Sequence, residues 1–227
     1  MTFSGALRLG LMGGTFNPVH LGHLRAAEEL TEYLNLDRVV FMPSHKPPHK
    51  PGLNLASFDH RLTMLKLAVA GQPLFMVSDL ESALPGPSYT VNTLRAVSEK
   101  LDANGELFFM VGFDSFQTLS KWYRHEELLK LASFSVFRRP GLGSELSSVG
   151  ELLTKLLGPP LETQVDPTGR SGAFLFPNVK PIHYFADCLL EISSTDLRKR
   201  LDLGTSVRYL VPEKVREYIA VNALYHR

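Results

Sequence analysis

This 227-residue chain has only one cysteine and one tryptophan, and its formal net charge is only +1. The single cysteine, Cys188, excludes an intrachain disulfide and a zinc site built from cysteines. Because the net charge gives no overall attraction to nucleic acid or a membrane surface, a phosphate ligand must be bound by a local site. No apolar run approaches the roughly 20 residues of a membrane helix, and the first residues lack a signal-peptide pattern. These absences favour a cytoplasmic protein without nucleic-acid or membrane partners.

The apolar residues, 44% of the chain, fall into two alternating patterns. Short apolar runs predict buried strands, and these occupy residues 7–12, 38–42, 74–77, 107–111, 134–137 and 182–185. Steps of three or four predict helices, and these occupy residues 24–34, 62–69, 90–101, 145–157, 195–201 and 212–224. The alternation predicts an α/β fold with a parallel, doubly wound sheet, helices on both faces, and every strand ending at one edge.

Two segments stand outside this alternation. Residues 158–181 are rich in glycine and proline and are expected to form a long irregular connection. Residues from about 194 to 227 are expected to form a small helical part, and the length fits a single domain over residues 1–227.

The first predicted strand ends at Gly13-Gly14, followed by Thr15 and, slightly later, His20 and His23. Ligands of such sheets bind beyond the carboxyl ends of the strands, and glycines let the backbone approach them closely. Two imidazoles at the positive end of a helix suit a phosphate better than a cation. Either histidine alone could be a cap or a surface residue, but the complete string favours a phosphate site. The common phosphate motifs GxxxxGK[ST] and GxGxxG are absent, as is the metal-binding HExxH.

Residues 13–23, GGTFNPVHLGH, closely resemble the GGTFDPxHxGH signature of bacterial nicotinate-mononucleotide adenylyltransferases, members of the HxGH nucleotidyltransferase superfamily. The resemblance implies a Rossmann-like nucleotidyltransferase fold. It also implies transfer of the adenylyl group of ATP to nicotinate mononucleotide, giving nicotinic acid adenine dinucleotide, a precursor of NAD. Asn17 stands where the family usually has Asp. Asparagine keeps the size and a carbonyl acceptor but loses the charge, so a structural role would survive and a charge-dependent role would not.

Further segments match the same family in the same order. Residues 88–94, SYTVNTL, imply that Thr90 lies near the nicotinate carboxylate, although Ser88 or Thr90 could also cap a helix. GFD at 112–114 implies that Asp114 binds ribose hydroxyls. The sole tryptophan, Trp122, is followed by Tyr123; the resemblance implies stacking on the pyridine ring, and core packing is the alternative.

Three more matches are assigned to the binding of ATP, the nucleotide that donates the adenylyl group. They are PPHK at 47–50, RRPG at 138–141 and ISSTDLR at 192–198. The alternatives are an exposed basic loop for PPHK and, for ISSTDLR, an ordinary helix cap with Arg198 as a surface residue. The resemblance gives His20, His23 and Arg198 to catalysis. It gives ATP and its phosphates to Gly13, Gly14, Thr15, Phe16, His49, Lys50, Gly112, Arg138, Ser193, Ser194 and Thr195.

The attacking phosphate has a second pKa of about 6 and is largely ionised at neutral pH, so no general base is required. Catalysis would then be positioning and charge stabilisation, with Mg²⁺ carried by ATP rather than held in a protein-built metal site. A preference for nicotinamide mononucleotide stays open, as does a homo-oligomer. Phosphopantetheine fits the segments around Thr90 and Trp122 poorly. A catalytically silent nucleotide-binding sensor is the alternative from another class, supported only by Asn17.

Overall fold

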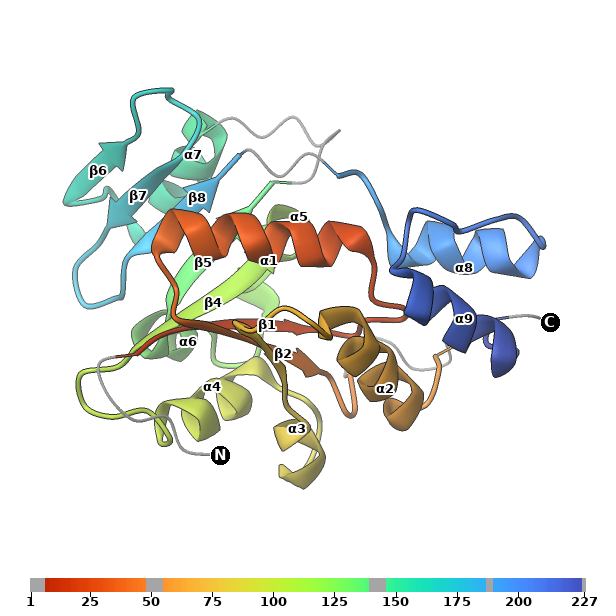
Figure 1. Cartoon of the computed structure of the whole chain (residues 1–227). Helices are drawn as coiled ribbons and strands as arrows, with labels where there is room; N and C mark the ends of the chain where they lie inside the picture. Colours follow the sequence, from red (N-terminus) through yellow and green to blue (C-terminus); the bar gives the residue numbers. More distant parts are fainter. Residues whose placement is uncertain (1–6, 48–54, 139–145, 187–189, 226–227) are drawn as a thin grey trace.

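The computed structural model describes residues 7–47, 55–138, 146–186 and 190–225. Its centre is an eight-stranded sheet with the order β3-β2-β1-β4-β5-β8-β7-β6 (Figure 1). The strands are β1 (Arg8–Gly14), β2 (Arg38–Pro43), β3 (Phe75–Val77), β4 (Glu106–Gly112), β5 (Ser133–Phe137), β6 (Glu162–Val165), β7 (Gly172–Leu175) and β8 (Ile182–Phe185). The strands from β3 to β8 in this order pair in parallel, which confirms the predicted α/β class.

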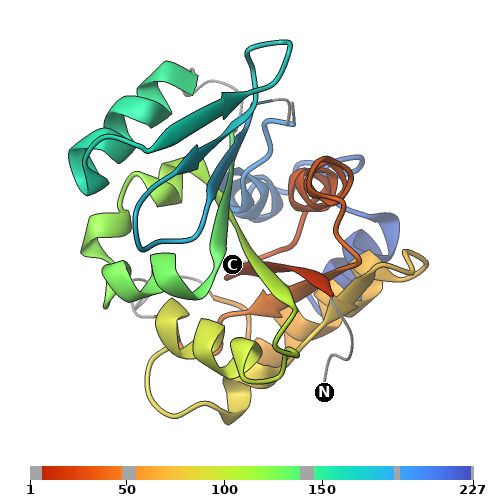
Figure 2. The ribbon, with the colours of Figure 1, turned by 90° about the vertical axis from the view of Figure 1, so that its left-hand side faces the viewer.

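Helices cover both faces of the sheet, as Figure 2 shows with the strands close to edge-on. They are α1 (Leu21–Leu34), α2 (Phe58–Val69), α3 (Leu80–Ala83), α4 (Thr90–Ser98), α5 (Phe113–Phe116), α6 (His125–Leu131), α7 (Leu146–Leu157), α8 (Ser194–Asp202), α9 (Glu213–Val221) and the 3₁₀ helix η1 (Leu119–Lys121). Apolar side chains of α1, α2, α8 and α9 pack on one face, and those of α4, α6 and α7 pack on the other. No helix within the described ranges is long and apolar enough to cross a membrane.

The expectation of a long irregular connection over residues 158–181 was wrong. β6 and β7 form an antiparallel hairpin that extends the sheet, with Thr163 opposite Phe174. All four residues of β6 are exposed, so the strand has no apolar pattern to reveal it. Pro167 and Gly169 lie in the turn between the two strands, where Asp166 Oδ1 accepts a hydrogen bond from the Thr168 backbone N–H at 2.7 Å. Because β7 runs against its neighbours, it does not end at the common edge that was predicted for every strand.

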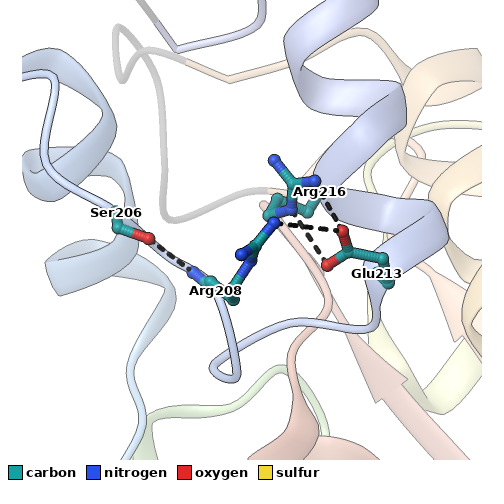
Figure 3. A network of polar contacts seen from close by, with 4 residues as sticks. All are labelled: Ser206, Arg208, Glu213 and Arg216. Atoms are coloured by element: carbon teal, nitrogen blue, oxygen red, sulfur yellow. Dashed lines mark hydrogen bonds and ion pairs between the residues drawn. The ribbon is translucent and has the colours of Figure 1, made fainter.

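The C-terminal helical part follows β8 and packs beside α2 (Figure 1). The loop before α9 is fixed by the polar contacts of Figure 3. Glu213 accepts hydrogen bonds from Arg216 at 2.9 and 2.5 Å and lies 3.8 Å from an Arg208 nitrogen, while the Arg208 backbone N–H donates to Ser206 Oγ at 3.1 Å. The contact with Arg216 lowers the pKa of Glu213. Pro212, predicted at the first helical position, is instead the N-cap of α9.

Candidate active site

A cavity of about 490 Å³ opens at the carboxyl ends of β1, β2 and β4, where ligands of open α/β sheets bind. It brings together most of the residues that the sequence nominated. Those among its lining residues are Gly13, Gly14, Thr15, Phe16, His20, His23, Thr90, Gly112, Asp114, Trp122, Tyr123, Ser193, Ser194, Thr195 and Arg198. Segments far apart in the chain therefore converge on one site, as expected of a two-substrate pocket.

Three nominated residues are not in this set. Arg138 lines a different cavity, together with Ser147, Arg170 and Phe174. His49 and Lys50 lie outside the described residues.

β1 runs into a turn over residues 13–18, called the glycine turn below. There is little space for a side chain at either of its two glycines. A Cβ atom on Gly13 would lie 3.2 Å from Phe109 Cε2, and one on Gly14 would lie 3.3 Å from the Phe16 ring. Phe16 itself is buried and has a left-handed backbone, with φ of 49°. The close approach of aromatic rings on both sides explains the glycine pair, because a methyl group at either position would displace one of them.

The two histidines lie directly after the turn. His20 is the N-cap of α1, with an exposed fraction of 1%, and its backbone N–H donates to His23 Nδ1 at 3.3 Å. The two rings stack with centroids 3.6 Å apart, and Phe16 contacts the His23 ring edge-on at 5.0 Å. The predicted pairing of the imidazoles is confirmed, and both line the cavity at the positive end of α1.

Helix α8 is bound directly to the backbone of the same turn. Ser194 Oγ donates to the Pro18 carbonyl at 2.9 Å, and Arg198 Nη1 donates to the Asn17 carbonyl at 2.8 Å. Ser193 is an ordinary N-cap, with its Oγ accepting from the Asp196 backbone N–H at 3.1 Å. Arg198 is thus no free surface residue, because its guanidinium joins the ISSTDLR segment at 192–198 to the GGTFNPVHLGH segment at 13–23.

On the opposite side of the cavity, α4 begins at Thr90, and Tyr89 is its N-cap without a side-chain hydrogen bond. Neither Ser88 nor Thr90 caps the helix; Ser88 Oγ accepts from the Lys46 backbone N–H at 2.9 Å instead. The Trp122 ring is partly buried against the core and contacts Phe109 edge-on at 6.2 Å. The start of α4 therefore presents a positive helix end to the cavity, next to an indole and the exposed Tyr123 ring.

Sequence reasoning missed Glu81, which also lines the cavity and is 7% exposed. Its Oε2 accepts from the His45 backbone N–H at 3.1 Å, and its Oε1 accepts from Thr93 Oγ1 at 2.8 Å. It lies on the four-residue helix α3, which no periodic pattern announces. Only its place seven residues before Ser88 could have drawn attention to it.

Arg61 was also missed, although it is the largest of the fully buried side chains. The helix predicted over residues 62–69 carries Leu62, Leu65 and Val69 at helical spacing, which predicts that these three form its buried face. The structure buries Leu65 and Val69 but, in place of Leu62, buries Arg61 with an exposed fraction of 1%. Burial lowers the pKa of the Arg61 guanidinium, and the nearby Tyr225 and Glu81 partly oppose this effect. An arginine in register with a helix's apolar positions was the available signal.

Comparison with known proteins gives a consistent result. Residues 11–200 match the family model described as cytidylyltransferase-like. A protein of Pelobacter propionicus is 38% identical over 222 residues, covering 96% of this chain and 98% of its own length, and one of Citrifermentans bemidjiense is 40% identical over 228 residues with the same coverage. Both carry the name "Probable nicotinate-nucleotide adenylyltransferase".

Among solved structures, the nicotinic acid mononucleotide adenylyltransferase of Plasmodium falciparum, in complex with NaAD, superposes with a TM-score of 0.71. It is 18% identical, and the match covers 96% of this chain and 97% of the other. At that identity the likeness concerns the fold, and it extends over nearly the whole chain.

Proposed function

The chain belongs to the cytidylyltransferase-like family and, within it, to the nicotinate-nucleotide adenylyltransferases, and from this we propose how its cavity works. The enzyme transfers the adenylyl group of ATP to nicotinate mononucleotide, releasing pyrophosphate and forming nicotinic acid adenine dinucleotide. One observation carries the assignment to this cavity: the glycine turn, the stacked histidines and Arg198 line it together with Thr90 and Trp122.

We propose that the triphosphate of ATP binds at the glycine turn. The backbone of Gly13, Gly14 and Thr15 and the imidazoles of His20 and His23 surround the reacting phosphate. Arg198 lies 2.8 Å from the Asn17 carbonyl, so its position relative to this turn is fixed before any ligand arrives. Donors held in place in this way stabilise the charge that develops on the phosphoryl oxygens without a reorganisation cost.

The mononucleotide is assigned to the opposite side. The uncapped start of α4 would hold the nicotinate carboxylate at Thr90, because an anion is stabilised where backbone N–H groups lack partners. The pyridine ring would stack on Trp122, and Asp114 would bind the ribose hydroxyls. An acid suits this helix end better than an amide, since only the acid carries a charge there.

The chemical step requires alignment above all. A mononucleotide phosphate oxygen attacks the α-phosphorus of ATP, the new P–O bond forms, and the bond to pyrophosphate breaks. The attacking oxygen is already ionised at neutral pH, so no residue has to remove a proton. The contribution of the protein is then to hold two phosphates in line and to stabilise the departing charge.

Mg²⁺ is expected to accompany ATP. Among the described residues no three His, Cys, Asp or Glu side chains are grouped closely enough to form a metal cage. We propose an ion held mainly by phosphate oxygens and water, which is the usual environment of Mg²⁺ in nucleotide sites. When bound, the ion would neutralise part of the triphosphate charge.

The test is a chromatographic assay of the purified protein with ATP, Mg²⁺ and either nicotinate or nicotinamide mononucleotide. We expect a dinucleotide and pyrophosphate in equal amounts, with a higher kcat/KM for the acid. A higher kcat/KM for the amide would contradict the assignment at Thr90. Binding of ATP without pyrophosphate release in the presence of either mononucleotide would indicate a sensor rather than an enzyme.

A further inference from the structure

Arg61 is a buried cation that the signature motifs do not include and that does not line the cavity. Its side chain nevertheless reaches the glycine turn from behind. Nη1 donates a hydrogen bond to the Thr15 carbonyl at 2.8 Å, and Nε donates to the Ala56 carbonyl at 3.0 Å. The guanidinium also lies over the Phe58 ring, 5.7 Å from its centroid. Together these contacts hold the Arg61 guanidinium in one orientation.

The turn is therefore held by side chains at successive points of its backbone. The carbonyls of Thr15, Asn17 and Pro18 accept hydrogen bonds from Arg61, Arg198 and Ser194, respectively. Two of these donors, Arg198 and Ser194, come from α8 and belong to the ISSTDLR segment at 192–198. The third comes from α2 and has no counterpart among the nominated residues.

Asn17 adds a reciprocal contact to the same arrangement. Its Oδ1 accepts from the Ala56 backbone N–H at 3.1 Å, while Arg61 binds the Ala56 carbonyl. Both backbone polar groups of Ala56 are thus hydrogen-bonded, the N–H to Asn17 and the carbonyl to Arg61, which also binds the turn at Thr15. An amide oxygen is sufficient for the Asn17 contact, which explains how this chain accommodates the departure from the usual Asp.

We propose that Arg61 is a positioning residue of the adenylyl-transfer site, which acts through the backbone of Thr15. This inference rests on the proposed function of the cavity. Removing the guanidinium leaves the partly buried Thr15 carbonyl without its donor and lets the turn relax away from the in-line geometry. Because displacements of about 1 Å in a catalytic site cost on the order of a hundredfold in rate, the effect falls on turnover rather than on substrate affinity.

The experiment compares Arg61→Met and Arg61→Lys with Leu65→Ala. Methionine has a similar length but no donor, whereas lysine keeps the charge and a donor. Leu65 lies one turn along the same helix, is fully buried and has a side chain that cannot donate a hydrogen bond to the turn, so its truncation matches a loss of α2 stability. The measurements are melting temperature, kcat and the KM of each substrate at a temperature where all variants are folded. Hydrogen exchange of the peptide that contains residues 13–18 is followed on the same samples.

We expect Arg61→Met to lower kcat by roughly tenfold to a hundredfold with both KM values within about threefold of wild type. The turn peptide should exchange faster, and Arg61→Lys should recover part of both losses. Leu65→Ala should lower the melting temperature without these effects. Wild-type kcat and exchange in Arg61→Met, or equal effects in Leu65→Ala, would overturn the proposal. If the wild-type protein forms no dinucleotide, the proposed function fails, while the exchange result still decides whether Arg61 holds the turn.

Discussion

Thr93 Oγ1 donates a hydrogen bond to the carboxylate of Glu81 at 2.8 Å, in the wall of the cavity. Glu81 also accepts from the His45 backbone N–H, so one buried side chain joins α4 to the segment that follows β2. Both contacts lie on the side of the cavity assigned to the mononucleotide. Glu81 is therefore expected to set the position of the α4 N-terminus relative to the rest of the site.

We expect Glu81→Leu to raise the KM of nicotinate mononucleotide by roughly tenfold, because an unsatisfied buried donor costs about 1–3 kcal/mol. The KM of ATP should change little, since the glycine turn is untouched. Glu81→Gln keeps an acceptor and a donor in nearly the same place and should lie close to wild type. Glu99→Gln, an exposed change at the other end of α4, is the control. Initial-rate kinetics with each substrate varied give the two KM values. Equal increases in both would contradict a role of Glu81 on the mononucleotide side of the cavity.

His23→Ala should lower turnover by roughly 10²–10³-fold, the usual cost of removing one donor from a charged transition state. His23 is only partly buried, so the variant should fold with a similar melting temperature. His60→Gln is a suitable control, because His60 pairs with Tyr218 at 2.9 Å and does not line the cavity. Near-normal turnover of His23→Ala would remove this imidazole from the reacting centre.

Trp122→Ala should weaken the mononucleotide more than ATP, because stacking on an aromatic side chain contributes about 1–3 kcal/mol per base. Trp122→Phe retains a flat ring and should recover most of the loss, although it lacks the Nε1 hydrogen bond to Thr118 Oγ1. The apparent Michaelis constants of the two substrates give the comparison. Equal increases for both substrates would refute stacking on the pyridine ring.

Stability should fall as the pH is lowered from about 6.5 towards 4, and His183 on β8 should account for part of the loss. Burial, with a smaller effect of the Arg8 charge, lowers the pKa of His183 to about 4. The unfolded chain takes up this proton near pH 6.5 and the folded chain only near 4, so protonation favours unfolding throughout that interval. Above pH 6.5 both states are neutral and the contribution to stability is complete.

Urea unfolding of wild type and His183→Gln at pH 7.5 and pH 5 tests this prediction. The pH-dependent loss of unfolding free energy should be about 2 kcal/mol smaller in the variant, as linkage requires for a shift of this size. His60→Gln, which changes a histidine on α2 rather than in the sheet, is the control. An unchanged pH dependence in His183→Gln would mean that the His183 ring is already protonated at pH 5 in the folded protein.

The sequence determined the elements that build the site and most of the side chains that line it. Strand runs and helical stripes identified the parallel part of the sheet because burial on both faces imposes an apolar pattern. The strings around Gly13, Thr90 and Ser194 were readable because each lies where a strand ends or a helix begins. The departure at Asn17 was also visible in advance, and its contact with Ala56 is a structural role for which an amide oxygen is sufficient.

Only the tertiary structure decided how these segments are held together. The hairpin β6–β7 has an exposed outer strand whose pairing comes from backbone hydrogen bonds, which leave no residue pattern. Glu81 and Arg61 act through contacts 12 to 46 residues distant in the chain, and the partner of Arg61 is a backbone carbonyl that any residue supplies. Arg138 is the opposite case. Its RRPG motif predicted a place in the ATP site, but in the fold it lines a different cavity. Local pattern thus indicated most of the residues that line the cavity, while their mutual support arose from packing between α2, α8 and the glycine turn.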